Sequence, residues 1–579
     1  MSENTKNRST VIDRFGGIDC TKSYIDHRVA RSIENFRVLA DGSIEKRGGF
    51  DHLCHIGTPV RAVYSFLTDG EYVLYALVSS NVLEINYTGN IIRQLGTVET
   101  TRGNACFFHY RETMYLMDEK NIYEYSGESF NTVNGYVPLV AKDWPTTVVG
   151  EIYEPRNIIT RHARATYKVD RDSIYLCTKD EVESIEALYI NGLLMNPSTY
   201  RIDSEFKTIN VQNMSVGDTV EVHFTYKNGF DELMQRLCSS TSCSTFGGIG
   251  GSRIFLGGAN RSGTVFTSEP VSVESLDASR KHYPQSGDLY FPLGREFQVG
   301  DGMSRVMAMT RFYDNLIIFT DEDVWIVNPD EKYGDPVAIS SANSRIGCPV
   351  NNGAVISENT PISIGKNSIY AWDTVSGNKL SAVNISAPIA EKLSPSQLKH
   401  CGIYYDVFNN EIWIYDNTFP TAWIYNTGSK AWYSYTNIKA DKVFDFGRRV
   451  AFIHEGELFV YNQNQAYDVD SDGDEYPIIA KYVSGYSDFG IPEKKNLCSF
   501  SISAKTGKDD LKFIFERLFG KKTFQMITTV PTAYKDAVYR HPVKRYDKAS
   551  FSIESYKDAK PKIYSLTLTQ CKASKRKEK

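Results

Sequence analysis

The sequence lacks any long hydrophobic run. No uninterrupted apolar stretch approaches the about 18 residues that a membrane-spanning helix requires. The opening residues, MSENTKNRST, are polar and lack the apolar core of a signal peptide. We therefore expect no membrane span, and we expect the chain to be made and folded in a cytosol.

A surplus of charge of either sign is also missing. The chain carries 65 Lys and Arg against 70 Asp and Glu, a formal net charge of -5 over 579 residues. Proteins that hold nucleic acid tightly usually have a basic surplus, because neutralised phosphates and released counterions supply their affinity. The near balance argues against an adhesive nucleic-acid binder.

Recognisable catalytic motifs are absent as well. The sequence holds no His-Glu-x-x-His motif, no Gly-x-Ser-x-Gly elbow and no repeated Ser-x-Asp-x-Gly-x-x-Trp turn of sialidases, and its ten histidines show no ligand spacing. We predict that the chain is not an enzyme. A glycan-degrading enzyme, which would act through paired carboxylates, is kept as an alternative.

The ten cysteines are scattered along the chain. Cys238 and Cys243, in CSSTSC, form the closest pair, but their spacing is wide for a zinc knuckle and no second pair of Cys or His follows at a useful distance. In a cytosol we expect buried or half-buried thiols.

Strand-forming residues are abundant. The 37 Tyr, 30 Phe and 41 Gly suit short strands joined by tight turns. Val60–Leu67, the turn Asp69-Gly70 and Tyr72–Val78 form a clear hairpin pattern. The sequence holds no convincing long amphipathic helix, and the best short candidates are Glu232–Leu237 and Pro388–Leu393.

One strand-turn-strand pattern repeats. It is visible in FHYRETMYLMDEKNIYEYS, RFYDNLIIFTDEDVWIVN and GRRVAFIHEGELFVYN. Repeats of about 40 residues with several strands each predict a β-propeller, because each unit must stack on its neighbours to bury its apolar faces. We predict an all-β fold with about seven blades, and six or eight as alternatives.

The repeat is interrupted once and then stops, which suggests a division into domains. We expect an N-terminal arm and hairpin joining the propeller (1–54), the propeller in two parts (55–149 and 229–466), an inserted small β-sandwich (150–228), an acidic linker (467–490), a C-terminal β-sandwich (491–571) and a basic tail, KASKRKEK (572–579).

The segment YDVDSDGDEYPII resembles the start of a calcium loop. Asp468, Asp470, Asp472 and Asp474 alternate along it as carboxylates facing one ion would. However, Ile479 stands where such a loop has its bidentate Glu, and no flanking helices are expected. An acidic turn linking two domains is favoured, with Ca²⁺ stabilising the linker as the alternative. We expect no other cofactor.

The first fifty residues combine a close backbone turn, a strand over Ile33–Leu39, an Asp41-Gly42 turn and a returning strand over Ile44–Lys46. This opening resembles that of a group of phage proteins known as tail nozzle, tail tubular or packaged-DNA stabilisation proteins. The matching residues are Phe15, Gly16, Gly17, Asn35, Gly42, Arg47 and Gly49.

Two further stretches extend the resemblance, in the same order along the chain. The inserted segment is similar to a small β domain common in phage tail and fibre proteins, and the exit from the propeller resembles the family's step into its terminal β domain. The matching residues are Asn191, Gly192, Tyr200, Gly217 and Asp218 in the first stretch, and Asp488, Phe489, Gly490, Pro492 and Lys495 in the second.

The resemblance implies a structural virion protein, assembled in the cytoplasm of a bacterial host. Members of the family usually form a ring of six copies below the portal and its adaptor, and the lumen retains the genome and conducts DNA at ejection. It implies self-association, contacts with portal, adaptor and other tail or fibre proteins, and transient non-specific contact with DNA. A conduit should not hold DNA tightly, and the near balance of positive and negative charge agrees with that role. The alternative is a receptor-binding or fibre-attachment protein that uses the inserted domain.

Overall fold

The computed structural model describes most of the chain. The described residues are 7–21, 26–68, 70–110, 113–172, 174–203, 205, 207–246, 253–259, 262–269, 289–300, 304–328, 338–343, 345–376, 379–505, 511–519, 522–530, 538–540, 543–557 and 559–573. The chain divides into two compact units, one of residues 1–78, 83–94 and 348–579 and the other of residues 79–82 and 95–347.

The first unit holds most of the sheet β6–β9 and three further propeller sheets. The first strands of these sheets contact one another in sequence, β30 with β34, β34 with β38 and β38 with β6, as the inner strands of propeller blades do. The four sheets are β6 (Val60–Thr68), β7 (Glu71–Val78), β8 (Asn81–Asn86) and β9 (Ile91–Thr97); β30 (Ala354–Ser357), β31 (Thr360–Ile364), β32 (Ile369–Ser376) and β33 (Lys379–Asn384); β34 (Gly402–Asp406), β35 (Glu411–Tyr415), β36 (Thr421–Asn426) and β37 (Ala431–Thr436); and β38 (Lys442–Asp445), β39 (Val450–His454) and β40 (Glu457–Asn462) with β5 (Gly49–His55).

The second unit holds three propeller sheets built in the same way. Strand β10 contacts β22, and β22 contacts β26. The sheets are β10 (Cys106–Tyr110), β11 (Thr113–Met117), β12 (Ile122–Tyr125) and β13 (Phe130–Thr132); β22 (Ser242–Phe246), β23 (Arg253–Gly257), β24 (Thr264–Thr267) and β25 (Phe297–Gln298); and β26 (Val306–Phe312), β27 (Asn315–Thr320), β28 (Val324–Asn328) and β29 (Ala338–Asn343). Short helix α1 (Asp231–Cys238) confirms one predicted helix.

The described residues thus form seven four-stranded groups, of which six are separate sheets and the seventh, β34–β37, is one end of a nine-stranded sheet. The all-β, propeller-like fold predicted from the repeats is confirmed. Second strands such as β27 are buried along almost their whole length, because neighbouring sheets cover both faces. In the second unit, Phe255 and Val265 of one sheet pack with Leu316 and Ile318 of the next. Among the helices of the described residues, none is long and apolar enough to cross a membrane.

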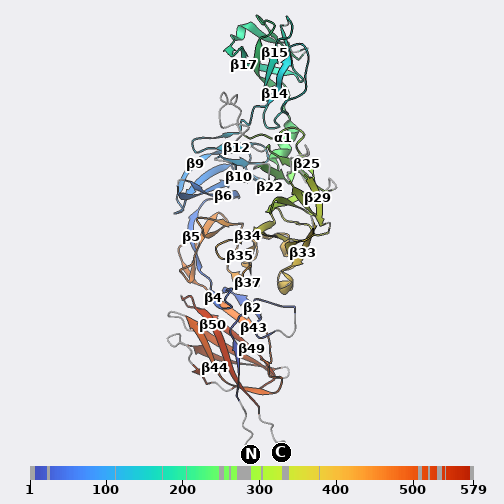
Figure 1. Ribbon diagram of the computed structural model, residues 1–579. Helices are drawn as coiled ribbons and strands as arrows, with labels where there is room; N and C mark the ends of the chain where they lie inside the picture. The colour runs from blue at the N-terminus through green and yellow to red at the C-terminus, as the bar shows by residue number, and fades with distance from the viewer. Residues whose placement is uncertain are drawn as a thin grey trace, which may run out of the picture. The chain divides into compact units, whose positions relative to one another are not determined.

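The inserted domain is two small sheets over one core (Figure 1). The five-stranded sheet runs β14-β15-β21-β17-β18 and the three-stranded sheet β16-β20-β19. Their strands are β14 (Leu139–Pro145), β15 (His162–Lys168), β16 (Tyr175–Cys177), β17 (Val182–Ile190), β18 (Leu193–Leu194), β19 (Tyr200–Asp203), β20 (Thr208–Val211) and β21 (Thr219–Tyr226). The domain begins with β14, earlier than the expected boundary at residue 150.

The C-terminal sandwich also differs from expectation, because N-terminal strands form part of it. In Figure 1 the blue strands β2 and β4 lie among the orange and red strands β43, β49 and β50. One sheet contains β3, β4, β50, β44, β47, β1 and β48, and the other continues from β37 through β2, β43, β49, β45 and β46. These strands are β1 (Arg8–Ile12), β2 (Ala30–Glu34), β3 (Phe36–Val38), β4 (Ile44–Lys46), β43 (Ala480–Ser484), β44 (Lys495–Lys505), β45 (Leu511–Phe519), β46 (Lys522–Val530), β47 (Val538–Tyr539), β48 (Val543–Tyr546), β49 (Lys548–Ser555) and β50 (Lys562–Lys572).

Three local expectations need correction. The strand expected over Ile33–Leu39 is two strands, β2 and β3, because Asn35 has a left-handed φ of 56°. The helix expected at Pro388–Leu393 is only a 3-10 turn, Ala387–Ile389. Within 467–490, a hairpin of β41 (Tyr467–Val469) and β42 (Glu475–Pro477) precedes β43, so this segment is not only a linker. Of the expected basic tail, residues 574–579 lie outside the described residues, as does Asp69 of the first hairpin.

Candidate functional site

The Phe-Gly-Gly element lays the N-terminal chain against strand β37. Ile18 N donates to the Trp432 carbonyl at 2.8 Å. A Cβ at Gly17 would lie 2.6 Å from the Trp432 nitrogen, and one at Gly16 would lie 2.8 Å from the Arg28 oxygen. Phe15 is buried with its ring edge-on to that of Tyr482. Glycine is therefore required here by the close approach of two backbones.

Asn35 joins three segments that lie far apart in the sequence. Its side-chain amide donates to Thr436 Oγ1 and to the Ile479 carbonyl, both at 2.7 Å. Its Oδ1 accepts from Thr436 N at 2.9 Å and from Arg47 Nε at 3.0 Å. Only Asn combines this donor and acceptor pair with tolerance of the left-handed backbone.

Arg47 lies at the centre of this junction, with only 1% of its side chain exposed. Besides Asn35, it donates to both Asp468 oxygens at 2.8 and 2.7 Å, to the Gly48 carbonyl at 2.8 Å and to the Thr436 carbonyl at 3.3 Å. All five guanidinium N–H groups thus have an acceptor. Burial acts to lower the pKa of Arg47, but the Asp468 carboxylate outweighs it and the pKa is raised.

Two motif glycines support Arg47. Gly42 lies in a turn with a φ of +83°, and its own carbonyl accepts from Phe15 N at 2.8 Å. A side chain at Gly49 would overlap the Tyr467 carbonyl, next to Asp468. We call Asn35, Arg47, Thr436 and Asp468 the N-terminal junction.

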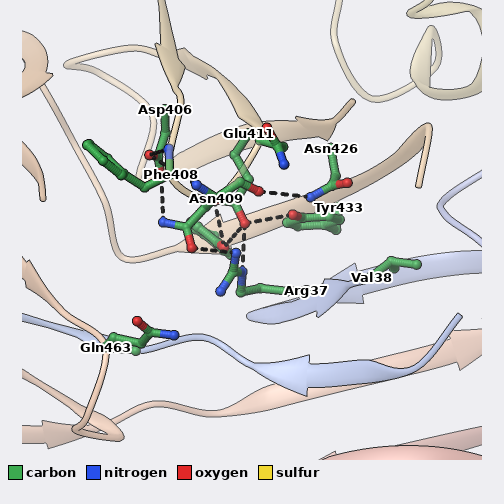
Figure 2. Close-up of polar contacts among 12 residues, drawn as sticks. Arg37, Val38, Asp406, Phe408, Asn409, Glu411, Asn426, Tyr433 and Gln463 are labelled. Carbon is green, nitrogen blue, oxygen red and sulfur yellow. Dashed lines mark hydrogen bonds and ion pairs between the residues drawn. The ribbon is translucent and has the colours of Figure 1, made fainter. Parts of the chain in front are cut away.

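A second buried ion pair lies on the neighbouring strand β3. Figure 2 shows Arg37 directed at Glu411 and Asn409. Arg37 Nε donates to Glu411 Oε1 at 2.6 Å, and Tyr433 and Tyr435 donate to the same carboxylate at 2.8 to 3.1 Å. Burial acts to lower the pKa of Arg37, whereas Glu411 raises it, and the result lies well above the usual value.

Asp406 completes this second cluster. It accepts from Asn409 Nδ2 at 2.6 Å, and Asn409 in turn accepts from Arg37 at 2.8 Å (Figure 2). Burial and the charge of Glu411 raise the pKa of Asp406 to about 6. The acidic groups are all committed to internal hydrogen bonds, so the arrangement is suited to fastening strand β3 to the sheet β34–β37.

The four aspartates of the suggested calcium loop do not converge. Asp468 pairs with Arg47, whereas Asp470 Oδ1 accepts from the backbone nitrogens of Asp472 and Asp474, each at 2.9 Å. These backbone hydrogen bonds lower the pKa of Asp470. In the part of the chain that the structure describes, no group of three or more His, Cys, Asp or Glu could hold a metal ion. The internal hydrogen bonds of Asp468 and Asp470 are those of an acidic turn.

The motif residues of the inserted domain lie in two adjoining turns. Asn191 (φ 52°) and Gly192 connect β17 to β18, and Asn191 Nδ2 donates to Asp218 Oδ1 at 2.9 Å. Asp218 also accepts from Ser215 N at 2.7 Å, closing the turn that contains Gly217 (φ 95°). Tyr200 begins β19 of the other sheet. Beside these turns, three apolar side chains are largely exposed: Leu193 (72%), Leu194 (66%) and Val216 (60%).

The C-terminal motif forms a turn that supports a buried lysine. Asp488 Oδ1 accepts from Gly490 N at 2.9 Å, and Phe489 is buried, whereas Pro492 is exposed. Lys495 Nζ donates to the carbonyls of Ile491 and Asp547, each at 2.7 Å. Burial lowers the pKa of Lys495.

No motif in the sequence points to Arg37, Asp406 or Glu411 as functional residues. The available indication was a single Arg between the apolar residues Phe36 and Val38. Its partner is 374 residues away, so no local pattern predicts the pair.

Comparisons with known proteins add no family. No family model matches the sequence, and no curated protein matches it. The N-terminal domain of BBS1, crystallised with ARL6, has a TM-score of 0.37 and 10% identity over 72% of this chain and 96% of that one. The CNH domain of AfRom2 has a TM-score of 0.34 and 8% identity over 71% and 97%. The C-terminal WD40 domain of Sif2 has a TM-score of 0.32 and 12% identity over 72% and 98%. With TM-scores this low, the fold assignment rests on the sheet topology.

Proposed function

We propose that the chain is a structural, non-enzymatic protein of a phage tail. It would form part of a ring-shaped nozzle or hub below the portal and adaptor, retain the packaged genome and conduct DNA at ejection. The observation that carries the proposal is the N-terminal junction. Asn35 and Arg47, two residues of the nozzle-like motif, belong to one buried cluster with Thr436 and Asp468. The nozzle-like opening therefore has a structural role in this chain, which suits a subunit that must keep its shape.

The proposed mechanism is mechanical. A ring subunit must keep its shape while DNA passes. Arg37 and Arg47, through their ion pairs with Glu411 and Asp468, connect the first fifty residues to strands much later in the chain. A net charge of -5 supports a lumen that contacts DNA only transiently, because few phosphates would be neutralised. Self-association, with six copies as the expected number, is part of the proposal.

Electron microscopy of the purified full chain, alone and mixed with its cognate portal–adaptor complex, tests this proposal. We expect a ring, or a cap with rotational symmetry seated on the portal complex. A chain that stays monomeric and never docks would contradict the nozzle role. Release of reducing sugars from host glycans would instead favour the enzyme alternative.

A second candidate is receptor binding or fibre attachment through the inserted domain. It is favoured by the exposed Leu193, Leu194 and Val216 beside rigid turns, since such exposed apolar side chains often mark interaction sites. The test is a full-length Leu193→Asp/Leu194→Asp variant. Under this candidate, the variant loses binding to host cells or fibre protein while its melting temperature stays that of the wild type. Unchanged binding would exclude these leucines from the contact.

A further inference from the structure

Two cysteine side chains of the C-terminal sandwich lie in direct contact. Cys498 is in β44 and Cys571 in β50, which are paired strands of the seven-stranded sheet. The two Sγ atoms are 3.1 Å apart, about 1 Å longer than a disulfide bond. Both residues are free thiols.

An irregularity of the strand pairing brings these sulfurs together. The register pairs Asn496 with Cys571 and Leu497 with Gln570, and it then shifts so that Ser499 pairs with Thr569. Cys498 is the extra residue of this bulge, and its sulfur contacts Cys571 across the strands. The contact follows from the backbone pairing of long strands, not from the rotamer of one exposed side chain.

Both thiols are only partly buried, so a small reagent can reach them. The Asn496 amide lies 3.8 Å from Cys571 Sγ, so this sulfur is the acceptor of two contacts. Burial and the Cys571 side chain raise the pKa of Cys498 to about 11. The Cys498 thiol is therefore protonated at neutral pH, so thiol exchange at this residue is faster in mildly alkaline buffer.

We propose that Cys498 and Cys571 form a reversible disulfide by exchange with a small-molecule disulfide such as oxidised glutathione. The Cys571 thiolate attacks one sulfur of the reagent, and one glutathione thiolate leaves. Cys498 then gives its proton to water and attacks Cys571 Sγ, displacing the second glutathione. Two protein thiols are oxidised, and one small disulfide is reduced to two thiols. This inference does not depend on the proposed tail function.

The bond would fasten the last strand of the sandwich to the strand beside it. Strand β50 also pairs with β1 and β4, so it holds the N-terminal strands in the same sheet. A cross-link between residues this far apart restricts the unfolded chain more than the folded one. Oxidation should therefore raise the melting temperature of the sandwich.

The test uses the full chain, incubated with oxidised glutathione in mildly alkaline buffer. After free thiols are blocked, non-reducing digestion and mass spectrometry should yield a cross-linked pair of peptides, holding Cys498 and Cys571, that dithiothreitol separates. The melting temperature should rise by roughly 3–8 °C on oxidation.

Matched variants isolate the pair. Cys498→Ser and Cys571→Ser should abolish both the cross-link and the rise, whereas Cys401→Ser, at a buried thiol of the first unit, should keep both. Recovery of Cys498 and Cys571 as free or separately glutathionylated thiols would overturn the proposal. So would a temperature rise that persists in Cys498→Ser.

Discussion

At the scale of single residues, Arg47 is tolerated in the interior because each of its N–H groups has an acceptor. Taking a charge out of water costs several kcal/mol, and the Asp468 carboxylate offsets that cost only while the bidentate geometry holds. Loss of either Arg47 or Asp468 should therefore lower the stability of the protein.

Arg47→Met should destabilise the protein by about 3–5 kcal/mol, since it removes the positive charge that pairs with Asp468 and one of the two donors to the Asn35 oxygen. Arg47→Lys keeps the charge but loses the planar fork, and it should also destabilise. Thermal and denaturant unfolding of the full chain measure the change. The matched control is Arg161→Met, which removes an exposed pair with Glu183 and should cost less than about 1 kcal/mol. A wild-type melting temperature in Arg47→Met would contradict the assigned role.

Glu124 provides a test of pH dependence. It is buried in β12, its Oε2 has no hydrogen-bond partner among the residues that the structure describes, and burial raises its pKa to about 7. A folded-state pKa above the unfolded value of about 4.5 means that the protonated form stabilises the fold. This contribution is fully present below about pH 4.5 and is lost as the pH rises through 7.

Glu124→Gln should therefore be more stable than the wild type by about 1–3 kcal/mol at pH 8 and nearly equal to it at pH 4. Melting curves recorded across that pH range compare the two chains. Glu128→Gln, at an exposed carboxylate three residues beyond the strand, should track the wild type throughout. If the stability of Glu124→Gln differs from that of the wild type by the same amount at every pH, the difference comes from packing and not from ionisation of Glu124.

At the scale of elements, the Phe-Gly-Gly segment determines how closely the N-terminal chain approaches β37. Gly17→Ala places a Cβ 2.6 Å from the Trp432 nitrogen and 2.9 Å from the Ala431 Cβ, closer than real side chains come. We expect a cost of about 2–4 kcal/mol, because two paired backbones must separate. Gly428→Ala is the control, since its Cβ would meet only ordinary contacts at 3.4 Å and beyond. Equal melting temperatures for the two variants would rule out this packing constraint.

The individual strands were largely predictable from the sequence, for a physical reason. The hairpin expected at Val60–Leu67 and Tyr72–Val78 appears as β6 (Val60–Thr68) and β7 (Glu71–Val78), because alternation and turn residues are local properties. Strand breaks depend on backbone geometry instead. Asn35 interrupts one expected strand since it adopts a left-handed φ to reach Thr436, and no neighbouring residue indicates that partner.

At the scale of the whole molecule, the limit of sequence analysis is long-range pairing. The count of propeller sheets follows from repeats, but the pairing of β1 and β4 with β50 joins residues more than 500 positions apart. The sequence indicates Asn35 and Arg47 as motif residues, whereas it suggests Asp468, the partner of Arg47, as a calcium ligand. Three-dimensional proximity, not chemistry, was the missing information.

The same long-range pairing makes the sheet β38–β40 depend on the N-terminal chain. Its fourth strand is β5, which pairs antiparallel with β40 from Gly49 to His55. Phe50 of β5 packs against the rings of Trp413, Phe452 and Tyr461, so the strand contributes to the core as well as to the sheet edge. Without β5, strand β40 would present an unpaired edge and a partly uncovered apolar face.

A chain of residues 56–579 should therefore have a lower melting temperature than the full chain and should aggregate on storage. A separate peptide of residues 26–55, which carries β2 to β5 but not β1, should improve dispersity by supplying these four strands in trans, since backbone pairing and side-chain packing hold them. Light scattering and thermal melting record both effects. The same peptide with Phe50→Asp should fail, because a charge would be buried among aromatic rings. If residues 56–579 remain monodisperse and melt as the full chain does, β5 is dispensable, and the sheet is held by β38–β40 alone.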